Sequence, residues 1–91
     1  MYEIVRSTKF KRDVKRAQKQ QKKMDKLRTV LNLLIEGQDL PVKNKDHFLS
    51  GNWSGYRECH IEPDWLLIYR TDEKEKLLEL VRLGSHSDLF S

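Results

Sequence analysis

The sequence predicts an α+β fold with an N-terminal strand, a two-helix hairpin and then an antiparallel β-meander. Apolar residues recur at helical spacing among many lysines in residues 8–36, whereas residues 56–83 contain short apolar runs separated by turn residues. Consecutive strands joined by short turns pair antiparallel, and the helices ahead of them pack on one face of the sheet. A chain of 91 residues has room for one such core, so residues 1–91 are expected to form a single domain.

The first strand and the first helix are predicted close to the N-terminus. Residues 2–5 alternate weakly and are rich in β-forming side chains. Ser7 or Thr8 can cap the helix that follows, because a short hydroxyl side chain accepts a hydrogen bond from a free backbone N–H of the first turn. The apolar stripe of this helix is formed by Phe10, Val14 and Ala17.

A second helix is predicted to end at Gly37, because glycine is a common helix terminator. Its apolar stripe is formed by Met24, Leu27, Leu31 and Leu34, with Val30 and Leu33 beside it. One continuous helix over residues 8–36 would be about 43 Å long at the usual rise per residue. So small a domain cannot accommodate that length, and a turn is therefore expected between Gln20 and Lys23.

Three strands are predicted in the second half, over residues 56–61, 65–70 and 77–83. Pro63 marks the first turn, because proline fixes its own φ and offers no N–H to a sheet. The charged segment 71–76 forms the second turn. Side chains alternate across a strand, so one face is expected to carry Tyr56, Glu58 and His60 and the other Arg57, Cys59 and Ile61.

The three histidines, His47, His60 and His86, each lie at or beside a predicted turn or strand end. Histidine can give or take a proton near neutral pH, since its ordinary pKa is about 6.5. Asp64 starts the strand after the turn that follows His60, so the hairpin is expected to bring these two residues close together. Side chains that converge in this way indicate acid-base chemistry.

Positive charge is concentrated near the N-terminus. Residues 1–30 carry eleven Lys and Arg against three Asp and Glu, a net charge of +8, and residues 31–91 carry seven against eleven, a net charge of −4. A segment this basic attracts phosphate backbones without reading sequence, and Lys11 and Lys15 are candidates for such contacts. The alternative is that the lysines only solvate the exposed faces of two helices.

Cys59 is the only cysteine of the sequence, so an intramolecular disulfide is impossible. Its neighbours place it inside a strand, which favours a small buried thiol over a catalytic nucleophile. No apolar run is long enough for a signal peptide or a membrane span. A cytoplasmic protein without membrane association is expected.

Several motifs follow one another in the second half: Lys45-Asp46-His47, Gly51-Asn52-Trp53, Gly55-Tyr56-Arg57-Glu58, His60-Ile61-Glu62-Pro63-Asp64-Trp65, Ile68-Tyr69 and Gly84-Ser85-His86-Ser87-Asp88-Leu89-Phe90. With these motifs and this order of elements, nearly the whole chain resembles the YafQ branch of the RelE/ParE toxin superfamily. The resemblance implies a RelE-like fold and a bacterial type II toxin that cleaves mRNA, usually in the ribosomal A site. It also implies a cognate antitoxin that inactivates the toxin, with operator DNA bound only through the antitoxin.

Carried over position by position, the resemblance implies a catalytic cluster of His47, His60, Asp64 and His86. Trp65 and Phe90 match aromatic residues that line the site of this branch. From the residues alone, Trp65 can equally belong to the core, and Phe90 can either stack on an RNA base or clamp the loop that carries His86. Trp53 is expected to pack, and Arg57 and Arg82 to have structural or electrostatic roles.

RNA cleavage without a metal needs a base for the 2′-OH proton, a donor that stabilises the phosphorane and an acid for the departing 5′-oxygen. Three histidines and a carboxylate can supply these groups, with His60 and His86 as the acid-base pair and His47 on the phosphate. The sequence does not order these roles, and no cofactor is expected. A zinc site is disfavoured because no His-x-x-x-His pair occurs. The alternative function is a non-catalytic basic module that binds RNA, DNA or an acidic protein.

Overall fold

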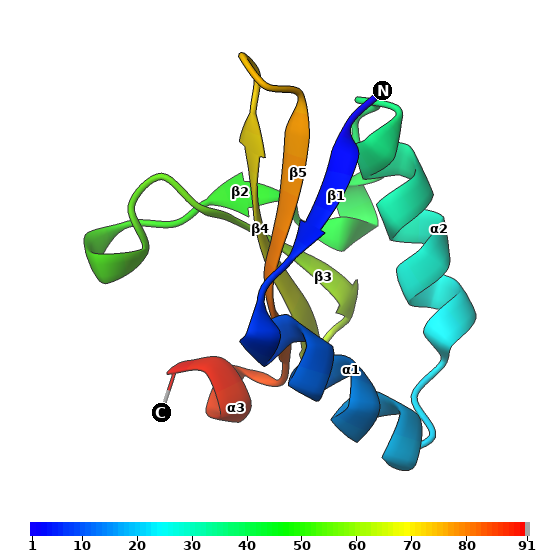
Figure 1. Ribbon diagram of the computed structural model, residues 1–91. Helices are drawn as coiled ribbons and strands as arrows, with labels where there is room; N and C mark the ends of the chain where they lie inside the picture. The colour runs from blue at the N-terminus through cyan, green and yellow to red at the C-terminus, as the bar shows by residue number, and fades with distance from the viewer. Residues whose placement is uncertain (91) are drawn as a thin grey trace.

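The computed structural model describes residues 1–90 and has one five-stranded sheet, with the strands in the order β1-β5-β4-β3-β2 (Figure 1). The elements in chain order are β1 (Glu3–Arg6), α1 (Thr8–Lys19), α2 (Met24–Ile35), the 3₁₀ turn η1 (Val42–Asn44), β2 (His47–Phe48), the 3₁₀ turn η2 (Gly51–Trp53), β3 (Arg57–Glu62), β4 (Trp65–Asp72), β5 (Leu77–Gly84) and α3 (His86–Phe90). β1 pairs with β5 in parallel, and the other neighbours are antiparallel. The predicted α+β class, with a strand, two helices and a meander, is confirmed.

The helix boundaries follow the predicted signals. The hydroxyl of Ser7 accepts the backbone N–H of Phe10 at 2.9 Å and so caps α1. The expected turn separates α1 from α2, and Gln21 in it has a φ of 58°, in the left-handed region. Gly37 has a φ of 71° just after the end of α2, a conformation that glycine adopts without steric cost.

The main core lies between the two helices and one face of the sheet. It is formed by the apolar stripes of α1 and α2 with Cys59, Ile61, Trp65, Leu67, Tyr69, Leu78, Leu80 and Leu83 of the sheet. The alternation predicted for β3 is confirmed, since Cys59 and Ile61 point into this core. β4 is buried on both faces, because alternate residues of the strand belong to a second cluster on the other side.

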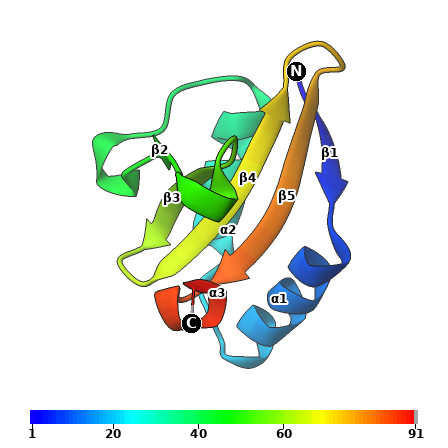
Figure 2. The same ribbon diagram turned by 90° about the vertical axis from the view of Figure 1, so that its left-hand side faces the viewer.

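The second face of the sheet is covered by short segments that the periodicity did not predict. Leu66 and Ile68 are fully buried there beneath Leu89 of α3 and the segment around η2. Figure 2 looks onto this face, with η2 in front of the sheet, α3 below it and α2 behind. His47 and His86 also belong to short elements, β2 and α3, and His60 lies on the neighbouring strand β3, so this part of the molecule carries the candidate site.

A buried carboxylate attaches α1 to the end of β5. Asp13 is 3% exposed, and its Oδ2 accepts the Nε–H of Arg82 at 2.8 Å and the backbone N–H of Leu83 at 2.9 Å. Arg16 of α1 lies 3.2 Å from Asp13 Oδ1 and donates to the carbonyl of Leu83. The expected structural role of Arg82 is confirmed, and α1 is thereby fixed to the residues that lead into α3.

We expect Asp13→Ala to lower the free energy of unfolding by about 3 to 5 kcal/mol, because it leaves the partly buried guanidinium of Arg82 and a buried backbone N–H without their partner. Urea denaturation of the purified variant measures this loss. Asp39→Ala, which removes an exposed carboxylate, is the matched control and should cost less than about 0.5 kcal/mol. Equal stabilities for the two variants would contradict a structural role for Asp13.

Candidate active site

The structure brings the four predicted catalytic residues to one end of the β3–β4 hairpin. His47 lies on β2, His60 on β3, Asp64 in the turn that joins β3 to β4, and His86 at the first position of α3. The ring centroids of His47 and His60 are 6.5 Å apart, and those of His60 and His86 are 5.8 Å apart. A group the size of a phosphate can therefore contact more than one imidazole.

Asp64 fixes the orientation of His86. Its Oδ1 accepts the backbone N–H of His86 at 3.0 Å and ring Nδ1–H at 2.8 Å. The backbone N–H of His86, followed by its ring, holds the pKa of Asp64 below its ordinary value. Because an ionised carboxylate only accepts, Nδ1 of His86 carries a proton, so a neutral form of this ring would have its lone pair on Nε2.

Backbone carbonyls fix the rings of the other two histidines. His47 Nδ1 lies 2.6 Å from the carbonyl oxygen of Lys45, and His60 Nδ1 lies 3.2 Å from that of Pro63. A carbonyl oxygen can only accept, so Nδ1 is the donor in both rings. Lys45 has a φ of 47°, which is unusual for a residue with a side chain, in the turn before His47.

Glu58 is the functional candidate that the sequence analysis did not single out. Its carboxylate is buried, and Oε2 lies 3.2 Å from His47 Nε2 and 3.7 Å from His60 Nε2. The signal was available, because strand alternation puts Glu58 on the same face as His60.

The two predicted aromatic contacts differ in exposure. Trp65 is 2% exposed and packs in the core on the helix side, so it offers almost no surface to a nucleobase. Of the two roles left open for Trp65, its burial favours the core role over base stacking. Phe90 is 44% exposed and lies edge-on to Trp53, with ring centroids 6.3 Å apart. It keeps a free surface beside His86 while packing against Trp53.

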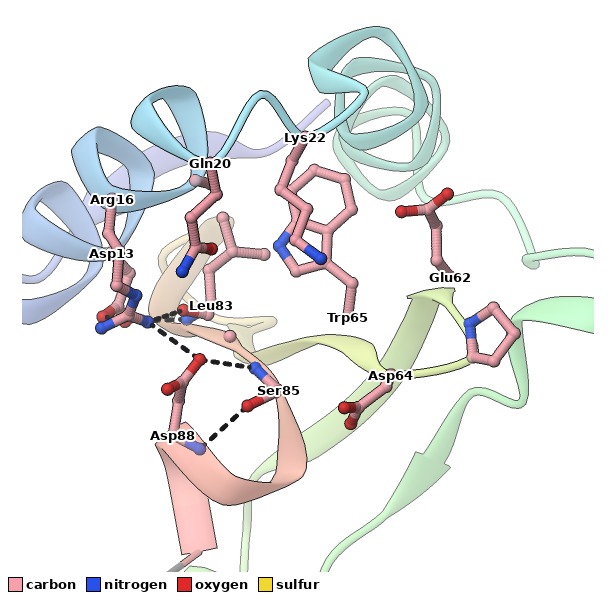
Figure 3. A pocket seen from close by; sticks show the side chains of 13 residues that line it. Asp13, Arg16, Gln20, Lys22, Glu62, Asp64, Trp65, Leu83, Ser85 and Asp88 are labelled. Atoms are coloured by element: carbon pink, nitrogen blue, oxygen red, sulfur yellow. Dashed lines mark hydrogen bonds and ion pairs between the residues drawn. The ribbon is translucent and has the colours of Figure 1, made fainter.

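A polar cavity of about 530 Å³ adjoins Asp64 (Figure 3). Gln20 and Lys22, which follow α1, point into it, and Trp65 forms part of its wall. On the opposite side Asp88 accepts the backbone N–H of Ser85, which holds the pKa of Asp88 below its ordinary value. This cavity leaves room for a polar group next to the Asp64–His86 pair.

A second cavity of about 510 Å³ lies on the other side of the β3–β4 turn, between α2 and η1. His60 lines it together with apolar side chains of α2, and Lys43 and Lys45 stand at its border. Glu62 and Pro63 line both cavities. The hairpin end that carries the catalytic candidates is therefore open on two sides.

Lys11 and Lys15 do not belong to this cluster. They line a separate groove of about 380 Å³, whose floor includes Phe10, Val14 and Leu27. None of the four predicted catalytic residues lines this groove. The prediction that these lysines contact substrate therefore requires an RNA or ribosomal surface that extends well beyond the cluster.

Other predicted roles are resolved by burial. Cys59 is buried, and desolvation raises the pKa of its thiol, which confirms a structural thiol. Arg57 pairs with Asp46 at 2.8 Å and contacts the Tyr69 hydroxyl, so its role is structural.

Within residues 1–90, no group of three or more His, Cys, Asp and Glu side chains is arranged to hold a metal ion. No helix in the same range is long and apolar enough to cross a membrane.

Comparisons with known proteins agree with the fold and with the motifs. The family described as "Bacterial toxin of type II toxin-antitoxin system, YafQ" matches residues 2–91. The chain is 47% identical over 89 residues to the mRNA interferase toxin YafQ of Escherichia coli K12, covering 97% of this chain and 95% of that protein. It matches all of the toxin chain in a crystal structure of the E. coli DinJ–YafQ complex, at 46% identity and a TM-score of 0.91.

A metal-bound toxin from Helicobacter pylori is similar to the same degree. Its crystal structure matches 99% of this chain and 100% of that chain, at 44% identity and a TM-score of 0.93. The two solved relatives therefore share one backbone arrangement with this protein along almost its whole length.

Proposed function

The chain belongs to the YafQ family of toxins of type II toxin–antitoxin systems, and on this premise we propose that it is an endoribonuclease that cleaves mRNA. The observation that supports the activity best is the convergence of His47, His60 and His86 with Asp64 at one hairpin end. A relative that is 47% identical over nearly the whole chain is named an mRNA interferase. The fold alone would not support a reaction, because one fold can host many functions.

The reaction that these side chains support is transesterification through the 2′-OH of the RNA. Nε2 of His86 takes the 2′-OH proton, and O2′ attacks the adjacent phosphorus. The bond from phosphorus to O5′ then breaks, and His60 gives a proton to O5′. His47 binds the phosphate and stabilises the charge of the phosphorane. The products are a 2′,3′-cyclic phosphate and a free 5′-OH.

No step of this reaction needs a metal ion, because imidazole and carboxylate groups supply the base, the acid and the phosphate contact. Because a similar toxin from Helicobacter pylori is metal-bound, the independence of cleavage from metal should be tested directly. Phe90 is 44% exposed beside His86, which supports stacking on a nucleobase, while its contact with Trp53 supports the alternative role of a clamp on the segment that carries His86.

We further propose that cleavage takes place in the ribosomal A site, in the cytoplasm. The net charge of +8 in residues 1–30 supports this proposal, because ribosomal RNA offers phosphate contacts at a distance from the reacting nucleotide. Lys11 and Lys15 then contact ribosomal RNA rather than the cleaved mRNA.

A non-catalytic binding module is the alternative function. The basic residues fit it, but it gives no reason for three histidines with fixed ring orientations at one hairpin end. Removal of one imidazole should stop RNA cleavage if the proposed reaction is correct. It should have no such effect on a module that only binds.

A cognate antitoxin is the expected protein partner, as in the DinJ–YafQ complex of the E. coli relative. The groove that Lys11 and Lys15 line also has Arg6 and several apolar side chains in its lining. An acidic amphipathic segment that folds on binding complements such a groove in both charge and polarity. Operator DNA is expected to bind through the antitoxin.

We expect His60→Ala and His86→Ala each to lower the cleavage rate by about 10²- to 10⁴-fold, because each removes a proton-transfer group. The 5′ ends of cellular mRNA, mapped after brief induction, should show new cuts inside reading frames for the unmodified chain alone. Lys74→Ala, an exposed change in the β4–β5 turn, is the control. Purified protein should remain active on ribosomes when EDTA is added at a concentration that leaves their magnesium in excess.

Two results would contradict this function. One is unchanged toxicity of both histidine variants without new RNA ends. The other is loss of cleavage after dialysis of the toxin against a chelator, with recovery on adding zinc, which would support a metal-dependent site instead.

Charge reversal in the separate groove tests the role of the lysines. Lys11→Glu with Lys15→Glu should weaken ribosome binding and make the dependence of log K on log salt shallower, by about 1 for each lost phosphate contact. Toxicity should fall in part, because the catalytic cluster is untouched. Lys74→Glu with Lys76→Glu changes the net charge equally and is the control. A salt dependence equal to that of the unmodified chain would show that Lys11 and Lys15 are merely solvated.

The antitoxin proposal is tested by co-expression with the product of a neighbouring open reading frame. We expect this product to bind the purified chain and to restore growth, since an acidic wrapping partner neutralises the basic surface. A scrambled version of its acidic segment is the control. Failure of every neighbouring product both to bind and to relieve toxicity would contradict the proposal.

A further inference from the structure

We propose that Gln20 and Lys22, which follow α1, form a subsite for the RNA nucleotide on the 5′ side of the cut, with its nucleobase in the polar cavity and its phosphate on Lys22. The inference deepens the proposed endoribonuclease function and rests on it for the side of the cut, because it takes His86 as the general base. Binding of RNA to this cavity is measured without cleavage, so the inference and the function are tested separately.

The turn that carries both residues has a fixed backbone. The N–H of Lys22 donates to the carbonyl of Ala17 at 3.0 Å. The N–H of Gln21 donates to the carbonyl of Gln18 at 3.1 Å, and Gln21 has a left-handed φ of 58°. Together these bonds form a Schellman motif, a common way to close a helix. Because the turn is ordered before a ligand arrives, binding costs little further backbone entropy.

The carboxylates of the cavity are already paired. Within residues 1–90, four of them line the cavity, and each has a partner in the protein itself. The pairs are Asp13 with Arg82, Glu62 with Lys26, Asp64 with His86, and Asp88 with Arg16 and Ser85. Because these partners offset the negative charge, the cavity does not repel an RNA chain as free carboxylates would.

Gln20 and Lys22 bring polar groups that are still available. Both side chains point into the cavity (Figure 3). Within residues 1–90, the ammonium of Lys22 forms no ion pair and the side-chain amide of Gln20 no hydrogen bond. Nζ of Lys22 lies 6.0 Å from the centroid of the Trp65 ring, and the side chain is half-buried, so its charge is held at the cavity wall.

These two groups fit the two parts of a nucleotide. An ammonium is a compact charge that donates to phosphate oxygens, and a carboxamide both donates and accepts, as the edge of a nucleobase does. The cavity of about 530 Å³ lies in the size range of sites for small molecules, and its amide-bearing wall suits a neutral polar ring better than a second phosphate. A nucleobase facing Gln20, with its phosphate at Lys22, uses both groups.

The place of the cavity relative to His86 gives the side of the cut. Asp64, which orients His86, and Ser85, which precedes it, both line the cavity. In the proposed reaction His86 takes the proton of the attacking 2′-OH, which belongs to the nucleotide on the 5′ side of the scissile phosphate. The RNA on this side therefore passes the cavity, whereas His60 and the second cavity adjoin the 3′ side.

The first test measures binding of a single-stranded RNA hexamer of mixed sequence with fluorine in place of every 2′-OH, so that it cannot be cut. When it is titrated into the purified chain, the side-chain amide NMR resonances of Gln20 should shift. Those of Gln38, an exposed glutamine after α2, should not. An unshifted Gln20 resonance at saturating RNA, or no binding of the hexamer, would overturn the inference.

The second test removes the charge of Lys22 with Lys22→Met, which keeps an unbranched side chain over the Trp65 ring. Binding of the hexamer should weaken, and the dependence of log K on log salt should become shallower by about 0.7 for one lost phosphate contact on a single strand. Lys22→Arg should retain the slope. Lys23→Met, the same charge change at the exposed neighbouring residue, is the matched control. Equal slopes for Lys22→Met and Lys23→Met would contradict a phosphate contact at Lys22.

The third test concerns the nucleobase. In 5′ ends mapped after brief induction, the unmodified chain should prefer certain bases at the nucleotide on the 5′ side of the cut. Gln20→Ala should reduce this preference by about fivefold, because an amide contact to a base edge is lost. The preference on the 3′ side should stay as it is, and Gln38→Ala should change neither. An unaltered 5′ preference in a folded Gln20→Ala variant would count against the subsite, with thermal unfolding as the check of folding.

The outcomes separate the inference from the proposed function. RNA cuts in cells, together with a Gln20 resonance that ignores the hexamer, would overturn the inference and leave the function intact. A hexamer that binds at Gln20 and Lys22, in a chain that makes no cuts, would overturn the function and leave an RNA-binding cavity.

Discussion

The buried carboxylate of Asp13 is the interaction on which the geometry of the site depends. It connects α1 to Arg82 and to the backbone of Leu83, one residue before Gly84. A Cβ at Gly84 would lie 2.8 Å from Nη2 of Arg16 and 2.9 Å from Cβ of Asp88, so the close approach of α1 and α3 requires glycine. The position of α3, and with it His86, is thus set by contacts on α1 rather than by the five residues of α3 themselves.

Two kinds of anchor then hold the histidines in place. Leu89 of α3 packs against Leu66 and Ile68, which fixes the short helix to the sheet by apolar burial. Polar anchors act on the rings, and each Nδ1 donates to an acceptor that cannot donate in return. This arrangement holds the three imidazole rings at one hairpin end, next to the apolar contacts of Leu66 and Ile68 on β4.

The sequence was sufficient to predict elements that show a periodic pattern or end at a turn residue. It was not sufficient to predict features that depend on a partner far away in the sequence. The helices, the three long strands and the turn at Pro63 all follow local patterns, and their predicted positions were correct within one or two residues. The elements β2, η1, η2 and α3 have two to five residues each, too few to show a period. The local sequence did not distinguish Asp13 from the other charged residues of a basic helix. It also did not indicate on which side of the sheet Trp65 would be buried. The grouping of the histidines was expected from their positions at turns and strand ends and from the family resemblance, whereas the contact of Glu58 with His47 also required the pairing of β2 with β3.

The two carboxylates of the site differ in burial and in their contacts with the histidines. The side chain of Asp64 is 67% exposed, and its lowered pKa means that it is ionised at every pH at which histidine titrates. The stabilisation that it gives to the docked His86 is present above the ordinary pKa of an aspartate and is lost only as the pH falls through the lowered value. It therefore orients His86 without changing its own charge in the working range. The side chain of Glu58 is 7% exposed, and its Oε2 lies 3.2 Å from Nε2 of His47 and 3.7 Å from Nε2 of His60. An exposed carboxylate thus orients His86, and a buried carboxylate lies between His47 and His60, at a single hairpin end.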